Sequence, residues 1–343
     1  MSCHVMLITT NLLFIVIIST MNKIFFTCYW ANADTILNAL KMNTPQCSGV
    51  WKNIEGTSNI TEADYIVILD DLDINLLNLG RKYFDSVVKD NYENVMFFAR
   101  ENDQIVARRK PSWFTTNVLP NMKNIYSDKT GFAYTFTPAN FLGKTYDDLK
   151  NLKYPKKTKL VSAIVSSTGT DPTYMQRKRF LIEYSKTNKV DIYGKGWEKN
   201  NPFGDNYKGV LGAYYALSTL PNQTTKFDGL IDYDFSISLE NYPQDKIISE
   251  KFSDAILSWT IPIYWGNKCV DIYPEYSYYS IDLDDPDVDI KINEILGKGV
   301  TDKNIRVMEK ARDLLLDKYN IWEYIYQLIN NKDEAKRIYS VYP

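Results

Sequence analysis

Histidine is nearly absent from this chain of 343 residues, which has only His4, close to the start of the sequence. A Ser–His–Asp triad, a Cys–His pair and a histidine metal site are therefore excluded for the rest of the chain. Any general base would have to be a carboxylate. The four cysteines show no CxxC spacing, so neither a thiolate metal site nor a disulfide framework is indicated.

An excess of charge of one sign is lacking as well. The chain has 40 Lys and Arg against 42 Asp and Glu, which gives a net charge of -2. No basic block stands out, so nucleic acid is not an expected partner. The most acidic run, residues 280–289, contains a proline and has no glycine at a calcium-loop position. We expect an exposed loop there and no metal site.

Long hydrophobic runs are limited to residues 5–21. This run is short for a membrane helix, which needs about 20 apolar residues. It is a single-pass anchor, a buried segment, or an artefact of start-codon choice, because Met21 resembles a native start leading into a strand. No small-residue cleavage site follows, which argues against a removable signal peptide. Membrane association through residues 5–21 and a cytoplasmic location both stay open.

Strand and helix patterns alternate along the chain, which predicts open parallel sheets of the α/β class. The length allows two domains. We expect a first domain over 22–150, a second over 151–300 and C-terminal helices over 301–343, since the polar stretch 151–159 reads as a linker. The expected strands are 23–30, 63–69, 94–99, 160–166 and 190–193, and the expected helices are 33–42, 74–88 and 176–185.

The most informative stretch is 234–265. Alternating apolar residues predict a strand over 235–239, and Ser249 is the expected N-cap of a helix that leads to a second strand over 261–265. Such a unit is a parallel crossover, and ligands bind beyond the carboxyl ends of its strands. Anions favour the helix N-terminus.

Three side chains are therefore expected to converge at this place. Asn241 offers a neutral hydrogen-bonding group, Glu250 an acceptor for hydroxyls and Lys251 a cation. Together with the helix N-terminus they would suit a nucleotide sugar. Spacing alone favours the simpler interpretation, that Glu250 and Lys251 are ordinary surface residues of a first helical turn.

The same stretch resembles the donor-binding motif of glycosyltransferase family 10, the α-1,3/1,4-fucosyltransferases. The matching pieces are S-L-E-N at 238–241, E-K at 250–251 and S-W-T-I-P-I-Y-W-G at 258–266. The resemblance implies a GT-B fold: two Rossmann-like domains facing a cleft, with C-terminal helices packing back across the interface. It also implies an inverting transfer of L-fucose from GDP-β-L-fucose to a glycan hydroxyl, which forms an α-linkage.

The partners implied by the resemblance are the nucleotide-sugar donor and a glycan or glycoprotein acceptor. No metal or other cofactor is obligatory, and stimulation by a divalent cation stays open. If residues 5–21 are an anchor, the location would be Golgi-like and single-pass. A transferase for another nucleotide sugar, or an inactive sugar- or nucleotide-binding module, remain the alternatives, because Ile247 stands where many relatives carry an aromatic residue.

In the family, a glutamate after a hydrophobic strand of the first domain is the candidate general base. Glu101 matches this position, although Asn102 replaces the proline usually found nearby. The competing carboxylates are Asp70, Asp71 and Asp103.

The resemblance also places a phosphate-contacting arginine at Arg177, since the family shows an arginine followed three residues later by phenylalanine, here Phe180. Arg177, Lys251 and the helix start at Ser249 would bind the diphosphate, while Asn241 and Glu250 would bind hydroxyls. Lys178 and Arg179 are expected on a solvated face, with either one as the phosphate ligand if the register slips by one residue. The irregular segment 200–232 has no assigned function, and a surface loop or an acceptor contact are both open.

Overall fold

The structure is a computed structural model, in which most of the chain is described. The described residues are 21–99, 110–126, 134–135, 142–212, 224–243, 247–333 and 335. Residues 5–20 and Glu101 lie outside them. None of the helices in the described part is long and apolar enough to cross a membrane.

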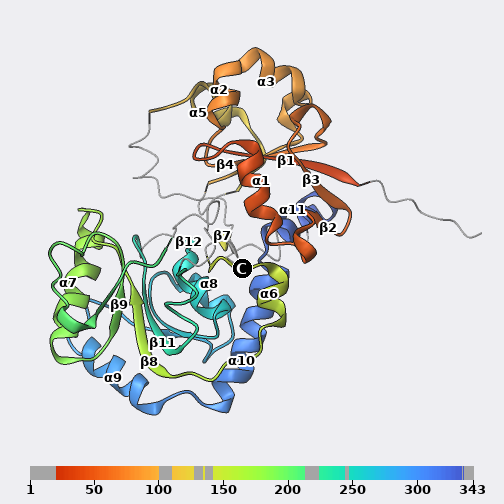
Figure 1. The fold of residues 1–343 in the computed structure, drawn as a ribbon. Helices are drawn as coiled ribbons and strands as arrows, with labels where there is room; N and C mark the ends of the chain where they lie inside the picture. Colours follow the sequence, from red (N-terminus) through yellow and green to blue (C-terminus); the bar gives the residue numbers. More distant parts are fainter. Residues whose placement is uncertain are drawn as a thin grey trace, which may run out of the picture.

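The first half of the chain forms a six-stranded sheet (Figure 1). Its strands are β1 (Asn22–Cys28), β2 (Val50–Trp51), β3 (Ile54–Thr57), β4 (Tyr65–Leu69), β5 (Val95–Phe98) and β6 (Ile125–Tyr126). They lie in the order β2-β3-β1-β4-β5-β6, and all neighbours are parallel except β2 and β3. The parallel strands thus follow the 2-1-3-4-5 order of flavodoxin-like domains.

The helices of this half are short. They are α1 (Ala33–Lys41), α2 (Ile74–Leu79), α3 (Arg81–Val87), α5 (Trp113–Asn117) and α6 (Tyr146–Asn151). The single helix expected over 74–88 is wrong, because the chain breaks at Gly80. Gly80 has φ 83, a left-handed conformation that glycine adopts without a steric cost.

The second half forms another six-stranded sheet. Its strands are β8 (Lys159–Ile164), β9 (Asp191–Tyr193), β10 (Tyr207–Gly209), β11 (Tyr233–Leu239), β13 (Ile261–Trp265) and β14 (Tyr279–Ser280). The order β10-β9-β8-β11-β13-β14 is parallel throughout. In chain order this reads 3-2-1-4-5-6, the order of dinucleotide-binding Rossmann domains, with its switch point between β8 and β11.

The helices of the second half lie around this sheet and continue to the end of the described chain (Figure 1). They are α7 (Pro172–Thr187), α8 (Glu250–Leu257), α9 (Val288–Lys298), α10 (Asp302–Asp313), a π-helical turn (Leu314–Lys318) and α11 (Ile321–Asn330). Helix α7 begins earlier than expected, at Pro172, because proline is well suited to the first helical turn. A small two-stranded sheet pairs β7 (Tyr134–Thr135) with β12 (Ile247–Ile248).

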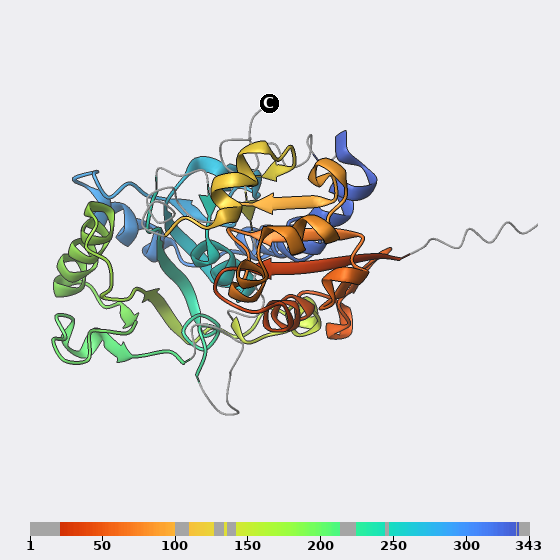
Figure 2. The same cartoon turned by 90° about the horizontal axis from the view of Figure 1, so that it is seen from above.

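The C-terminal helix α11 packs against the N-terminal sheet, as Figure 2 shows from above. Trp322 is fully buried, donates from Nε1 to the carbonyl of Leu40 at 2.9 Å, and meets the ring of Phe26 edge-on. The Glu323 carboxylate accepts a hydrogen bond from Trp51 Nε1 at 2.7 Å. The C-terminal helices therefore return across the interface between the halves.

Two Rossmann-like domains joined in this way form the GT-B architecture, so the predicted fold class is confirmed. We propose a domain boundary at 150/151, in the last turn of α6 and before β8, and a C-terminal helical part that begins at 301.

Candidate active site

A cavity of about 490 Å³ opens in the second domain. Its walls include residues that follow three parallel strands: Ser166 after β8, Gly194 after β9 and Asn241 after β11. Strands β8 and β11 flank the switch point, where neighbouring crossovers run to opposite sides and leave a crevice. The cavity therefore lies where this topology places ligands.

The start of α8 forms one wall of the cavity. Ser249 is its N-cap, as predicted, and its hydroxyl accepts from the amide of Lys251 at 3.2 Å. The buried carboxylate of Glu240 accepts from the amide and hydroxyl of Ser249, at 3.1 and 2.6 Å, and from the hydroxyl of Tyr264 at 3.0 Å. Glu240 thus fixes the start of α8 against the end of β11.

Glu240 had no role in the sequence reasoning, although it lies within the S-L-E-N motif. One feature of the sequence could have indicated this role: Glu240 directly follows a buried strand. A carboxylate buried at that place needs several hydrogen-bond donors around it.

We expect Ser249→Ala to lower the free energy of unfolding by about 1 kcal/mol, since a lost N-cap leaves an amide of α8 unsatisfied. Urea denaturation followed by circular dichroism would measure this. Ser249→Asp, which keeps a capping oxygen but adds a charge next to Glu240, should not restore full stability. Equal stability of the alanine variant and the natural protein would contradict the assigned cap.

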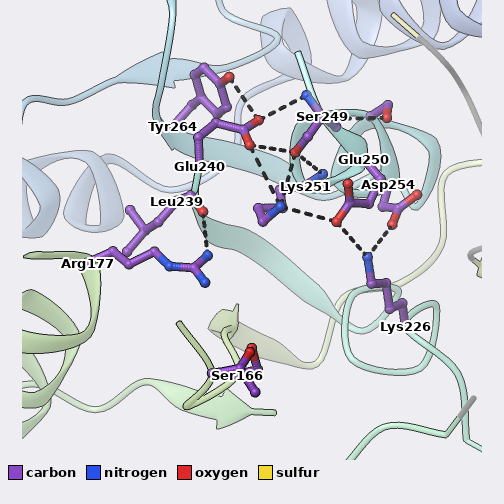
Figure 3. A network of polar contacts seen from close by, with 12 residues as sticks. Ser166, Arg177, Lys226, Leu239, Glu240, Ser249, Glu250, Lys251, Asp254 and Tyr264 are labelled. Atoms are coloured by element: carbon purple, nitrogen blue, oxygen red, sulfur yellow. Dashed lines mark hydrogen bonds and ion pairs between the residues drawn. The ribbon is translucent and has the colours of Figure 1, made fainter. Parts of the chain in front are cut away.

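Lys251 lies at the centre of a polar network (Figure 3). Its ammonium is 3.2 Å from Oε1 of Glu250, 3.3 Å from the hydroxyl of Ser249 and 3.8 Å from Oε2 of Glu240. Its side chain is mostly buried and lines the cavity. Glu250 and Lys251 are therefore parts of a buried cluster and not ordinary surface residues.

A second lysine, Lys226, completes this network. Its ammonium lies 3.3 Å from Oε1 of Glu250 and 3.2 Å from Oδ2 of Asp254, and its side chain is only 9% exposed. Lys226 belongs to the segment 200–232, to which the sequence reasoning gave no function. The sequence does offer one indication of such a partner. Glu250 and Asp254 share one face of α8 at i, i+4 spacing, and two buried acids need a nearby cation.

The two acids of α8 respond in opposite ways to this environment. Burial works to raise the pKa of Glu250, but the charges of Lys251 and Lys226 outweigh it and hold that pKa well below its ordinary value. Burial raises the pKa of Asp254 to about 7, and the neighbouring Glu250 charge adds to this against the opposing charge of Lys226. Glu250 is thus the ionised acceptor, while Asp254 titrates near neutrality.

We expect the stability of the protein to fall between about pH 4 and pH 7 through Asp254. The folded protein holds this proton more tightly than the unfolded chain, so the contribution is full at low pH and is lost as the pH rises through 7. One such proton changes the free energy of unfolding by at most about 1.4 kcal/mol per pH unit. Urea denaturation at pH 5, 6 and 7 measures this. The free energy of unfolding should depend less on pH in Asp254→Asn than in the natural protein, and the same dependence in both would refute the expectation.

Arg177 enters the cavity from α7 on the opposite side (Figure 3). Its guanidinium donates to the carbonyl of Leu239 at 3.3 Å and lies 4.7 Å from the ring centre of Tyr174. The side chain is buried, and a buried cation at a cavity wall can meet an anion. The structure therefore brings Arg177 to the same cavity as Lys251.

The two basic residues after Arg177 differ from each other. Arg179 is exposed, as predicted. The prediction of a solvated Lys178 is wrong: this side chain is 8% exposed and donates to the carbonyls of Ser167 and Gly169 at 3.0 and 2.7 Å. Lys178 holds the loop after β8 in place.

Asn241 lies at the end of β11 and lines the cavity. Its Oδ1 is buried and has no hydrogen-bond partner among the described residues. An unsatisfied buried acceptor is costly unless a bound group supplies a donor. This atom therefore points to a ligand with a hydroxyl or amino group.

The expected general base, Glu101, and its competitor Asp103 lie outside the described residues. Of the other competitors, Asp71 accepts from the hydroxyl of Ser112 at 3.0 Å and from the amide of Leu72 at 2.8 Å, which is a structural role. Asp70 is buried at the end of β4 with φ 69, a conformation that costs energy for a residue other than glycine. Within the described chain, no group of three or more His, Cys, Asp or Glu could hold a metal ion.

The two Rossmann-like domains give the chain a GT-B-like fold, and the cavity of the second domain is lined by cationic side chains. Residues 154–294 match the family model described as glycosyltransferase family 10 (fucosyltransferase) C-term. The matched span contains the whole 238–266 motif and the walls of the cavity described above. The second domain of the chain therefore matches glycosyltransferase family 10, the fucosyltransferase family, as the motif predicted.

No curated protein sequence matches the chain. Among solved structures, an α1,3-fucosyltransferase with GDP is 16% identical, with 94% of this chain and 93% of that chain covered and a TM-score of 0.41. An α1,3-fucosyltransferase with GDP-fucose is 17% identical, with coverages of 96% and 94% and a TM-score of 0.43. TarM is 15% identical, with coverages of 78% and 54% and a TM-score of 0.40.

Proposed function

We propose that this protein is an inverting fucosyltransferase that moves L-fucose from GDP-β-L-fucose to a hydroxyl of a glycan or glycoprotein and forms an α-linkage. The observation that carries the proposal is the cavity at the switch point, where Arg177, Asn241, Glu250 and Lys251 meet. Two cations, a helix N-terminus and two hydroxyl-binding groups match the chemistry of a nucleotide diphosphate sugar. The family match over 154–294 supports the same reaction class.

In this proposal the diphosphate lies between Arg177 and Lys251. Ser249 caps α8, whose first amides and positive dipole end add to the attraction for an anion. The same groups stabilise the negative charge that grows on GDP as the bond to fucose breaks. No metal is assigned to this task, because the cationic side chains perform it.

Hydroxyl groups of the donor are assigned to Asn241 and Glu250. The unsatisfied Oδ1 of Asn241 accepts a hydrogen bond from such a group. The carboxylate of Glu250 is held ionised by its two lysines and accepts another. Both contacts strengthen if the sugar carries partial charge in the transition state.

Glu101 is assigned as the general base. Its carboxylate takes the proton of the acceptor hydroxyl while that oxygen bonds to the anomeric carbon. The bond from the anomeric carbon to the phosphate oxygen breaks on the opposite face, and the electron pair leaves with GDP. The configuration therefore changes from β in the donor to α in the product.

Isothermal titration calorimetry with GDP, GDP-fucose, GDP-mannose and a UDP-sugar tests the donor assignment, using protein that starts at Met21. We expect binding of GDP and GDP-fucose and turnover of GDP-fucose on an acceptor array. The comparison of nucleotides matters because Ile247 replaces an aromatic residue of many relatives. Absence of GDP binding would overturn the fucose assignment, and binding without turnover on any acceptor would favour a binding module.

A further inference from the structure

The segment before β11 contributes directly to the cavity, although nothing in the 238–266 motif requires it. Val210, Leu211 and Gly212 line one wall. Lys226 lies farther along the same segment and reaches the acids of α8, with Nζ between Glu250 Oε1 at 3.3 Å and Asp254 Oδ2 at 3.2 Å (Figure 3). Burial of a lysine is unfavourable unless its ion pairs offset the lost hydration. The burial of Lys226 therefore points to a role for its two ion pairs.

The charges of the cluster provide one. Two lysines, Lys226 and Lys251, face the carboxylates of Glu240, Glu250 and Asp254. When Asp254 is protonated, these described side chains carry two positive and two negative charges, which balance. Without Lys226, the cluster would carry one excess negative charge beside a cavity assigned to a diphosphate.

The same oxygen of Glu250 is shared by both lysines, at 3.3 Å from Lys226 and 3.2 Å from Lys251. If Lys226 were neutral, Glu250 would keep Lys251 as its lysine partner in the network. That ion pair would hold the Lys251 ammonium more tightly and oppose its contact with a phosphate.

We infer that Lys226 is a positioning residue of the donor site: it neutralises the acids of α8 and thereby leaves the Lys251 ammonium available to the diphosphate. The inference rests on the proposed function, because it concerns the same donor. It also gives Lys226, in the described part of the segment 200–232, a role in donor binding, where the sequence left a surface loop or an acceptor contact open.

The test compares Lys226→Met with Lys226→Arg by calorimetry with GDP-fucose, whose diphosphate does not titrate near neutral pH. We expect the methionine variant to bind about tenfold more weakly or worse, as for the loss of a charged contact, and the arginine variant to recover most of the affinity. Thermal unfolding of each variant shows whether it is folded. Unchanged affinity in a folded Lys226→Met protein would overturn the inference.

Asp254→Asn separates positioning from a purely structural role. It removes a negative charge that appears in the natural protein as the pH rises through 7. Donor affinity of this variant should match the natural protein at pH 6 and exceed it at pH 8, opposite in sign to Lys226→Met. A merely structural role predicts weaker binding for both variants, and that result would contradict the inference.

Several charged groups lie around Asp254. Lys226, Glu250 and Lys251 are the charged neighbours that act on its titration. From α10, Arg312 contacts the carbonyl of Leu257 at the other end of α8.

If the natural protein binds neither GDP nor any nucleotide sugar, the proposed function itself fails and the inference falls with it. If the natural protein binds and Lys226→Met binds equally well, only the inference fails.

Discussion

Glu101→Gln is expected to lower kcat by about 10²- to 10⁴-fold while the affinity for GDP-fucose stays unchanged. Glutamine keeps the size of the side chain and its hydrogen-bonding capacity but cannot take a proton from the acceptor hydroxyl. The chain offers no histidine beyond His4 to replace it. Initial rates of fucose transfer at saturating donor and acceptor measure the effect, and calorimetry measures the affinity.

Asp103→Asn is the matched control, because it removes a carboxylate two residues away in the same stretch. It should retain most of the activity. If Glu101→Gln keeps full activity and Asp103→Asn or Asp70→Asn loses it, the general base is that other carboxylate and not Glu101.

Lys251→Ala should weaken the binding of GDP-fucose by about 1.5–3 kcal/mol, the usual contribution of a hydrogen bond to a charged group. The ammonium lines the cavity at the capped start of α8, where the amides attract the same anion. The variant also leaves Glu240 and Glu250 without this counter-charge, and their negative charge adds to the loss. Calorimetric dissociation constants for donor and for GDP measure the change.

Lys186→Ala provides the control for a lost positive charge. This lysine is exposed near the end of α7, pairs with Glu183, and is not among the residues that line the cavity. Its removal should leave donor affinity within experimental error. A Lys251→Ala protein with natural affinity would remove Lys251 from the donor site.

The sequence was sufficient where local patterns determine the structure. The alternation over 235–239, the N-cap at Ser249 and the buried strand over 261–265 all appear as predicted. The parallel sheets followed from the alternation of strands and helices, and the two domains from the length and the polar stretch 151–159. The strand–helix–strand unit over 234–265 indicated a ligand site beyond the carboxyl ends of its strands.

Contacts between distant residues could not be predicted in this way. Lys226 meets Asp254 across 28 positions of the sequence, and its segment has no periodic pattern that would reveal the contact. Lys178 appeared to be one of two solvated cations, yet it is buried by the carbonyls of the loop after β8. Glycine has a low helix propensity, but this alone did not distinguish a glycine tolerated within one helix from the break that Gly80 makes with its positive φ.

The small ladder between β7 and β12 has a mechanical consequence. Ile248 pairs with Thr135, a residue that precedes β8 and the second sheet, and it directly precedes the cap of α8. A hinge movement of the domains would therefore either carry the start of α8 along or break these backbone hydrogen bonds. If the domains open for product release, that movement is coupled to the start of α8, which is proposed to bind the diphosphate.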